Sequence, residues 1–308
     1  MLQKTIAIGL AALLAVGAGW FAKTPGTPPP PALRVLLIPA DGGTESGTLA
    51  DYRPIFNAIA HQTGLRFDLR VAQSYGGVVE AMCNNATDIA FVGPVTYLQA
   101  RERHCAELLA VAVKGGRSVY YSGLFVRTDA PFRAIGDLRG HRVAFGDLNS
   151  TAAFLFPVTM LMDAGIDPSR DLSEVRIAGS HSASLTALLA GKVDAAALSF
   201  ESYDKAVRAD LPGVRNVRVL ARSEPIPYPP LILSTRLPAA TRAKLRDAFE
   251  KISHSPGVTP EMIRGYGGAQ VDGYDADVTP AHFRSAEMRM AQVSGPLKAA
   301  LLRKAAER

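Results

Sequence analysis

Short hydrophobic runs alternate along this chain with longer segments whose hydrophobic residues recur every three or four positions. Runs of the first kind are typical of buried strands, and segments of the second kind are typical of helices. The predicted strands lie at 34–39, 66–71, 88–92, 108–113, 120–126, 142–145, 175–178, 194–198, 217–221 and 231–234. The predicted helices lie at 49–62, 75–83, 150–164, 182–190, 203–208, 239–253, 259–264 and 280–292, and another begins at 93–94. This alternation predicts an α/β fold with mostly parallel sheets.

Two groups of strands and helices follow one another, and they predict two lobes. Residues 33–125 form the first lobe, and residues 126–222 form the second. Residues 223–308 contain one strand and several helices but no complete sheet, so we expect them to return to the first lobe. Two lobes joined by crossing segments close on a ligand by a hinge motion, with the ligand in the cleft between them.

The N-terminus has the pattern of an export signal. Lys4 precedes an apolar run that extends to residue 22, and residues 16–18 are small enough for cleavage. The run is slightly short for a membrane span, but an uncleaved anchor remains an alternative to a cleaved signal peptide. In both cases the rest of the chain is exported, and we expect it in the periplasm. The prolines of residues 23–32 predict a stiff, extended linker.

The composition and motifs of the chain argue against nucleic-acid binding, metal binding and catalysis. The chain of 308 residues carries a formal net charge of +6, which is spread along the sequence. Nucleic-acid binding requires a basic stripe with interleaved aromatic residues, and none is visible, so a nucleic-acid partner is not expected. The six histidines show no metal-ligand spacing, and the nucleophile motif Gly-x-Ser-x-Gly is absent. We therefore expect no metal, no cofactor and no enzyme activity.

The chain has two cysteines, Cys83 and Cys105. An exported protein meets an oxidising compartment, which predicts a structural disulfide between them. Two alternatives stay open. The thiols could be free and buried, or they could form a soft-ligand site for a thiophilic species such as arsenite.

Candidate chemistry centres on residues 145–154, which read as a strand end, a polar loop and a helix start that carries Ser150 and Thr151. Free backbone N–H groups at a helix start, with two hydroxyls beside them, can hold a small tetrahedral oxyanion. The alternative is that the two residues only cap the helix. No catalytic group lies next to the loop in sequence, so the segment predicts a protein that holds an anion rather than one that transforms it.

Several other phrases occur with the loop in a definite order. They are Gln73–Ala81, Thr87–Tyr97, Tyr120–Arg127, Ile135–Gly140, Gly179–Leu185 and Gly191–Asp204. Together they resemble the phosphate, phosphite and phosphonate-binding proteins of ABC importers, and the resemblance covers nearly all of residues 33–235. It implies a type II periplasmic binding fold, with a hinge between the lobes and the ligand in the interlobe cleft.

The resemblance also implies roles for single residues. Ser150 and Thr151 match the hydroxyl residues that hold the phosphorus-centred oxygens. Tyr75 matches a tyrosine that closes over the ligand from the first lobe, and Tyr120 or Tyr121 matches an aromatic residue near the hinge. His181 matches a histidine that donates to the oxyanion from the second lobe.

Two further candidates are Tyr97 and Glu201, which could equally serve core packing and a helix start. Glu201 lies where binders of aminophosphonates place a carboxylate for the ligand's ammonium group. The family often has a third hydroxyl where this chain has Ala152, and a second acid where it has Pro229. These departures favour a compact oxyanion over a bulky aminophosphonate.

The expected role is that of a monomer that captures a small oxyanion for an ABC permease in the inner membrane. The alternative is a periplasmic oxyanion or arsenite sensor of the same fold that signals to a membrane histidine kinase, with one cysteine as ligand. We expect anion binding to weaken as the pH rises above the pKa of His181, whatever the value of that pKa.

Overall fold

A computed structural model describes residues 31–39 and 45–307. The predicted export signal and nearly all of the proline-rich linker lie outside these residues. From Ala32 onward the chain forms one compact unit, and the elements below belong to it. In this described part, no helix is both long and apolar enough to cross a membrane.

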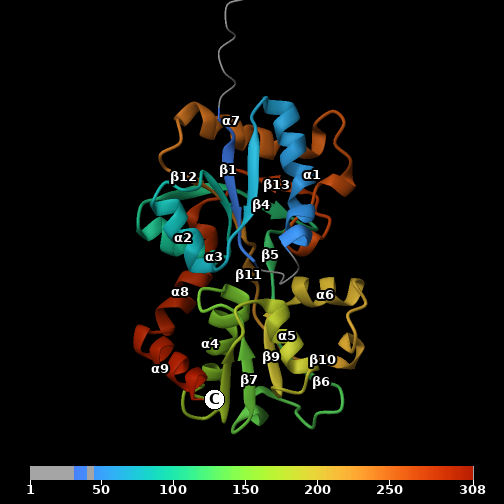
Figure 1. Ribbon diagram of the computed structural model, residues 1–308, viewed down its shortest axis with the longest axis vertical. Helices are drawn as coiled ribbons and strands as arrows, with labels where there is room; N and C mark the ends of the chain where they lie inside the picture. The colour runs from blue at the N-terminus through green and yellow to red at the C-terminus, as the bar shows by residue number, and fades with distance from the viewer. Residues whose placement is uncertain (1–30, 40–44, 308) are drawn as a thin grey trace, which may run out of the picture. The chain divides into compact units, whose positions relative to one another are not determined.

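The first lobe is built on a six-stranded sheet of order β13-β4-β12-β3-β1-β2 (Figure 1). Its strands are β1 (Leu33–Leu37), β2 (Phe67–Val71), β3 (Ile89–Phe91), β4 (Ala106–Val113), β12 (Pro230–Ser234) and β13 (Gly273–Asp275). Its helices are α1 (Glu45–Thr63), α2 (Tyr75–Cys83), α3 (Pro94–Glu102) and α7 (Ala239–Glu250). Because β3 and β12 are buried along their whole length, they read in the sequence as continuous hydrophobic runs.

The second lobe is built on a five-stranded sheet of order β10-β6-β9-β7-β8. Its strands are β6 (Ser122–Arg127), β7 (Arg142–Phe145), β8 (Glu174–Ile177), β9 (Ala195–Ser199) and β10 (Val217–Arg222). Its helices are α4 (Phe156–Asp163), α5 (His181–Leu189) and α6 (Phe200–Arg208). The predicted two-lobed α/β fold is confirmed.

Both sheets are mixed, so the expectation of mostly parallel sheets was wrong. The parallel strands lie side by side at one end of each sheet, since β1 pairs with β2 and β3, and β7 pairs with β8 and β9. The first strand of each sheet to follow a crossing between the lobes pairs in the antiparallel direction, as β12 does with β3 and β6 does with β9. Sequence periodicity does not carry strand direction, and therefore could not distinguish the two arrangements.

The lobes are joined by an antiparallel pair of short strands, β5 (Val119–Tyr120) and β11 (Ile226–Pro227), which lies between the two sheets (Figure 1). A third connection is made by the C-terminal helices α8 (Arg284–Gln292) and α9 (Gly295–Ala306). Helix α9 packs against β8, and the Lys304 ammonium donates to the Ser169 carbonyl. Residues 223–308 were expected to return to the first lobe, but their last helix, which the hydrophobic pattern missed, lies on the second.

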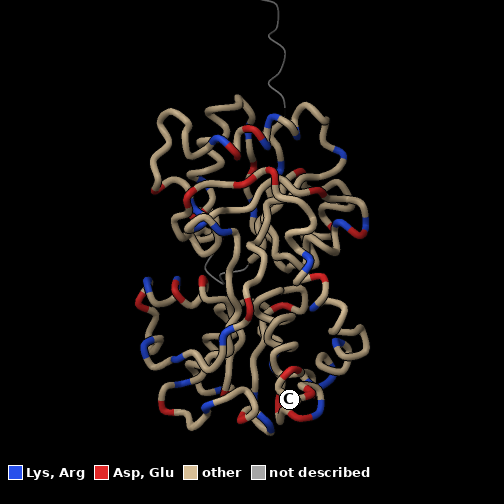
Figure 2. Tube along the Cα trace, turned by 180° about the vertical axis from the view of Figure 1, so that it is seen from behind, with Lys and Arg blue, Asp and Glu red and all other residues tan. Residues whose placement is uncertain are grey.

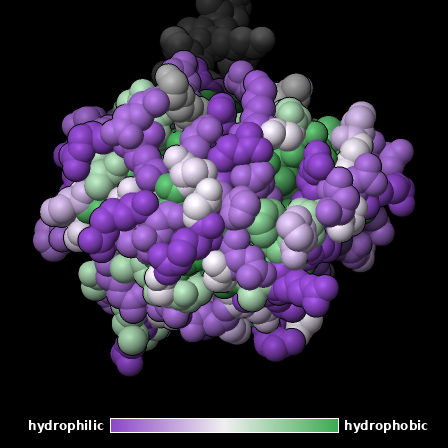
Figure 3. Space-filling view, turned by 90° about the horizontal axis from the view of Figure 1, so that it is seen from below, coloured by the Kyte–Doolittle hydropathy of each residue, from purple (hydrophilic) through white to green (hydrophobic). Residues whose placement is uncertain are grey.

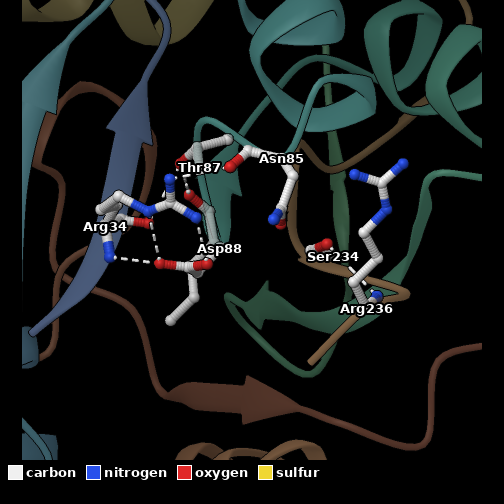
Figure 4. A network of polar contacts seen from close by, with 7 residues as sticks. Arg34, Asn85, Thr87, Asp88, Ser234 and Arg236 are labelled. Carbon is white, nitrogen blue, oxygen red and sulfur yellow. Dashed lines mark hydrogen bonds and ion pairs between the residues drawn. The ribbon is translucent and has the colours of Figure 1, made fainter. Parts of the chain in front are cut away.

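The two sheets repeat one set of polar contacts at the start of β1 and β7, each of which is the central one of the three parallel strands in its sheet. In the first lobe, the Arg34 guanidinium donates two hydrogen bonds to the Asp88 carboxylate, and the Arg34 N–H donates a third at 2.8 Å (Figure 4). In the second lobe, Arg142 makes the same three bonds to Asp194. Each Asp N–H in turn donates to the carbonyl of its arginine. Each pair therefore joins the central strand to its parallel neighbour. The pairs lie at the amino-terminal ends of these strands, and the helices begin at the opposite ends.

A disulfide joins Cys83, at the end of α2, to Cys105, just before β4, with their Cα atoms 4.9 Å apart. It fastens the helix that begins at Tyr75 to the sheet of the first lobe. With both sulfurs paired, neither cysteine of this chain offers a thiolate.

Charged residues of both signs are interspersed along the chain (Figure 2). The face of the molecule in Figure 3 is mostly hydrophilic, with hydrophobic residues scattered among the polar ones. The large apolar side chains lie in the core, where Phe56, Phe125 and Phe154 are each at most 1% exposed. Burial of this apolar surface supplies the main driving force for the fold.

We expect Arg34→Met to destabilise the protein by about 2 kcal/mol, because it leaves the half-buried Asp88 carboxylate without its charge-assisted bonds. The matched control is Arg70→Met, whose partner Asp68 is 43% exposed, and it should cost less than about 1 kcal/mol. Urea unfolding measures both. Equal losses in the two variants would contradict the proposed role of the pair.

The cost of Arg34→Met should also depend on pH. Burial raises the pKa of Asp88, but the hydrogen bonds from Arg34 outweigh it and the pKa is lowered on balance. A lowered carboxyl pKa stabilises the fold above the ordinary value of 3.8, and this contribution is lost as the pH falls through the lowered value. The difference between the wild type and Arg34→Met should therefore shrink in acid.

Replacing both cysteines by serine should lower the free energy of unfolding by about 3 kcal/mol, since the disulfide closes a loop with a sequence separation of 22. Thiol titration of the unreduced, unfolded wild type should find no free thiol. Two reactive thiols would contradict the disulfide.

Candidate functional site

Several helices begin where strands of the two sheets end, and their first turns meet between the lobes. Serine caps the start of α2, α5 and α6, because the side chains of Ser74, Ser180 and Ser199 each accept a hydrogen bond from a backbone N–H of the first turn. Helix α3 begins at Gly93, which has no side chain to cap it. The Val95 N–H in its first turn instead donates to the Thr151 hydroxyl of the other lobe, at 3.0 Å.

The loop that carries Ser150 and Thr151 enters its helix through a π-helical turn, Thr151–Leu155, before α4 begins. Pro157 lacks the N–H that would bond the Ala153 carbonyl in an ordinary helix, and the Gly146 N–H donates to that carbonyl instead, at 2.8 Å. A Cβ at position 146 would lie 2.6 Å from the Ala153 Cβ, so this close approach requires glycine. The predicted helix 150–164 is therefore irregular in its first turn, a feature that often marks functional sites.

Ser150 both caps this turn and faces the histidine. Its Oγ accepts from the Ala153 N–H at 3.1 Å and lies 3.3 Å from Nε2 of His181. The Ser199 N–H donates to Nδ1 of His181 at 2.9 Å, so Nδ1 is an acceptor and the ring proton lies on Nε2. With two donors directed at its oxygen, Ser150 has its own hydroxyl proton left for another acceptor.

His181 is 2% exposed, and burial lowers its pKa from 6.5 to about 3. The imidazole is therefore neutral throughout the neutral range and offers one donor, the Nε2–H. With the pKa this low, a weakening of anion binding above the His181 pKa would fall in acid, and His181 gives no reason for binding to change near pH 7.

Tyrosines complete the cluster around Thr151. The Tyr120 hydroxyl is hydrogen-bonded to Thr151, and Tyr75 and Glu201 lie close enough to act on its charge. Burial first, then these two groups, raise the pKa of Tyr120 well above its ordinary value, so it stays protonated. Gly93 packs between Tyr75 and Thr151, since a Cβ there would lie 3.3 Å from the Thr151 hydroxyl oxygen.

The structure thus brings together most of the residues that the sequence singled out. Of the predicted site residues, those grouped here are Tyr75, Tyr120, Ser150, Thr151, His181 and Glu201. All but Glu201 are at most 3% exposed. The donors offered by Ser150, Thr151, Tyr120 and His181 are hydroxyls and a neutral imidazole, which are strong hydrogen-bond donors to an oxyanion in a site without water.

Two predicted residues pack outside this cluster. The Tyr97 ring packs on Phe283 at 4.8 Å between centroids, with the Arg101 guanidinium 5.9 Å away. The Tyr121 ring lies under the Arg222 guanidinium at 3.4 Å, beside the hinge strands. Neighbouring residues of an extended strand point to opposite sides, which explains why Tyr120 and Tyr121 diverge.

Sequence reasoning missed four residues beside the cluster, Ser199, Ser202, Tyr228 and Tyr266. The Tyr266 hydroxyl lies 2.9 Å from the Ser202 Oγ and accepts from the Ser199 Oγ at 3.2 Å. The Tyr266 N–H donates to the Tyr228 hydroxyl at 2.8 Å. A serine just after a strand was a usable signal for Ser199, but Tyr266 arrives from a distant loop and left no signal in the hydrophobic pattern.

No group of three or more His, Cys, Asp or Glu side chains that could hold a metal occurs within 31–39 and 45–307. The chemistry of the cluster is that of hydrogen-bond donors. Such an arrangement can bind and orient an anion. Ser150 and His181 are in contact, but the proton on Nε2 makes the imidazole a donor toward the serine oxygen.

The comparisons with known proteins agree with this geometry. Residues 43–276 match the family described as ABC transporter, phosphonate, periplasmic substrate-binding protein. The chain is 30% identical over 179 residues to the phosphate-import protein PhnD of Mycolicibacterium smegmatis, covering 57% of this chain and 53% of that one. It is 27% identical over 210 residues to the phosphonates-binding periplasmic protein of Escherichia coli, covering 67% and 62%. The chain thus spans less than two thirds of these relatives' length.

The fold is also that of a solved structure, PhnD1 from Prochlorococcus marinus in complex with methylphosphonate. The two share 15% sequence identity with a TM-score of 0.75, over 85% of this chain and 98% of the other. At this identity the likeness establishes the arrangement of the chain and leaves the ligand open.

We expect the His181 imidazole to stay neutral and to carry its proton on Nε2 between pH 5 and 8, since its pKa lies at about 3. Nitrogen-15 NMR of labelled histidine reports the tautomer and the titration. The unfolded chain, which takes up the proton near 6.5, is the control. Because only the unfolded state binds this proton, His181 should also make the fold less stable as the pH falls below 6.5. A titration of His181 between pH 6 and 7 in the folded protein would contradict the buried neutral state.

Proposed function

The chain belongs to the family of periplasmic substrate-binding proteins of phosphonate ABC transporters, and on that premise we propose that it captures a small phosphorus oxyanion. Phosphate, phosphite and a short phosphonate are the ligands that this site suits. In this proposal the loaded protein delivers its ligand to an ABC permease in the inner membrane, as an exported monomer in the periplasm.

The observation that carries the proposal is the buried set of uncharged donors around Ser150 and Thr151. The Ser150 hydroxyl, the Tyr120 hydroxyl and the His181 Nε2–H come from both sides of the contact between the lobes. Hydrogen bonds to a charged acceptor are roughly twice as strong as neutral ones, and exclusion of water strengthens them further. Because these donors are directional, they also discriminate tetrahedral anions by the number of their oxygens and protons. A lysine or arginine side chain discriminates them less well.

The similar proteins support an anion whose central atom is phosphorus. One is a phosphate importer, another is a phosphonate binder of the periplasm, and the neighbour in fold is in complex with methylphosphonate. Within this chain, Ala152 offers no side-chain donor where a third hydroxyl is common, and its carbonyl accepts from the Ser122 hydroxyl at 2.6 Å. Fewer donors favour an anion with fewer oxygens to satisfy, such as phosphite or methylphosphonate.

Capture requires the lobes to separate, because the donors are at most 3% exposed. The bonds that must break include Val95 N–H to Thr151, Gln99 to Asn149 at 2.9 Å, and the Arg208 guanidinium to the Gly267 carbonyl at 3.0 Å. The two-stranded ladder of β5 and β11 is the natural hinge for this motion, since it is short and crosses between the sheets. In this proposal the anion replaces bonds that the donors otherwise make with one another.

The sensor alternative gains no support from the site. An arsenite ligand needs a thiolate, and the disulfide pairs Cys105 with Cys83. No feature of the cluster distinguishes a kinase partner from a permease, so the importer role follows from the family.

The test is a thermal-shift and calorimetry panel of phosphate, phosphite, methylphosphonate, 2-aminoethylphosphonate, sulfate and arsenite. A ligand at 100 times its Kd stabilises the folded state by about 2.7 kcal/mol. The combined variant Ser150→Ala, Thr151→Val should weaken binding of the best phosphorus anion about 100-fold or more, because it removes two charge-assisted bonds.

The matched control for that variant is Ser184→Ala. Its hydroxyl is equally buried in the second lobe but donates to the Ala144 carbonyl, away from the cluster. It should bind the anion with wild-type affinity. A wild-type protein that responds to none of the phosphorus anions, or to arsenite alone, would refute the proposed function.

A further inference from the structure

A tight loop of the first lobe carries Tyr266 into the cluster. Residues 264–270 begin and end in a backbone bridge between Arg264 and Gln270, and the Gly265 N–H donates to the Ala269 carbonyl at 2.9 Å. Gly267 and Gly268 both have a positive φ, of 71° and 67°, which favours glycine. The loop is therefore held in one conformation by its own backbone.

This loop is docked on the start of α6 in the second lobe. A Cβ at Gly267 would lie 3.1 Å from the Glu201 carbonyl oxygen, so the two backbones approach as closely as glycine allows. The Arg208 guanidinium donates to the Gly267 carbonyl, and the Lys205 ammonium pairs with Asp51 at 2.5 Å beside it. The loop thus belongs to the contacts that form when the two lobes are together.

The side chain of Tyr266 lies in the middle of the site. It is 2% exposed, and its ring centroid is 5.8 Å from that of Tyr120 and 6.0 Å from that of His181. Its hydroxyl is bonded to Ser199, which caps α6, and to Ser202 in the first turn of that helix. The hydrogen bonds hold the hydroxyl end of the ring, and the loop holds its backbone. While the lobes are together, the ring therefore stays in this position.

We infer that Tyr266 sets the size of the group that a bound phosphorus anion can carry beside its oxygens. The inference rests on the proposed function and deepens it. The oxygens of the anion bind the donors at Ser150, Thr151 and His181, and the substituent on phosphorus must point elsewhere. The Tyr266 ring, adjacent to both His181 and Tyr120, forms an apolar wall there. A hydrogen or a methyl group fits against it, whereas a longer chain collides with a ring that cannot move.

The inference assigns a role in ligand selectivity to a residue whose hydroxyl also helps to hold the two lobes together. If Tyr266 served only to dock the loop on α6, its loss would weaken every ligand to the same degree, since closure would become harder for all. If it is the wall, its loss changes the ratio of affinities between short and long phosphonates. The ratio therefore separates the two roles.

The experiment measures Kd by calorimetry for phosphite, methylphosphonate and propylphosphonate, with the wild type and with Tyr266→Ala. The wild type should prefer methylphosphonate to propylphosphonate. Tyr266→Ala should shift that ratio toward propylphosphonate by about tenfold or more, the range over which pockets discriminate small changes in apolar size. Tyr266→Phe keeps the ring and should keep the wild-type ratio, even if all affinities fall together.

Two further variants serve as a control and as an alternative test. Tyr203→Phe is the matched control, because it removes a tyrosine hydroxyl of α6 that donates to the Val217 carbonyl outside the cluster, and its ratio should be that of the wild type. If Tyr266→Ala fails to fold, Tyr266→Leu retains apolar bulk and should shift the ratio in the same direction.

The outcomes distinguish the inference from the proposed function. A wild type that binds methylphosphonate, with a ratio that Tyr266→Ala and Tyr266→Leu leave unchanged, overturns the inference alone. A wild type that binds propylphosphonate as tightly as methylphosphonate also overturns it. A wild type that binds none of the three anions overturns the proposed function and the inference with it.

Discussion

The constraint on which the site depends is that backbone N–H groups at a buried helix start must find acceptors. In this protein, helix starts from both lobes meet in one place, because the carboxyl ends of the parallel strands of both sheets point there. Serine side chains satisfy most of them, as Ser150, Ser180 and Ser199 do. Helix α3, which starts at Gly93, has no such cap and takes the Thr151 hydroxyl of the other lobe as an acceptor. An anion bound between the lobes would also accept hydrogen bonds from these N–H groups. The requirement that shapes the fold is therefore the one that the proposed ligand meets.

The two lobes use one plan, and the repetition gives the site its rigidity. In each, the central strand is tied to its parallel neighbour by an arginine and an aspartate, Arg34 with Asp88 and Arg142 with Asp194. The pairs lie at the amino-terminal ends of these strands. They therefore fix strands whose carboxyl ends lead into the site. Movement is thereby left to the connections between the lobes, the short β5–β11 ladder and the passage through α8 and α9. A binding protein requires this division, since rigid walls set selectivity and a flexible joint admits the ligand.

Much of the fold could be predicted from the sequence because its signals are local. Strand β7 and helix α2 have the bounds that their hydrophobic runs and the capping Ser74 predicted. Residues 145–154 were singled out for the same reason, since a strand end, two hydroxyls and a helix start are adjacent in the chain. The strand pairings, the course of α9 and the neutral state of His181 could not be predicted in this way. Each depends on which distant segment packs against the residue, as the Ser199 N–H does against the histidine ring.

By itself, then, the sequence determined the elements, the two-lobed α/β class and the loop that offers donors to an oxyanion, because these follow from spacing within a few residues. Only the tertiary structure decided which side chains share the loop's surroundings. It placed Tyr120 against Thr151, with Tyr75 on the other side of Gly93, and turned Tyr121 toward Arg222. It also brought Tyr266 from a distant part of the chain to lie beside Tyr120. The physical reason is that burial and hydrogen-bond satisfaction are properties of the folded neighbourhood, which no local pattern of residues contains.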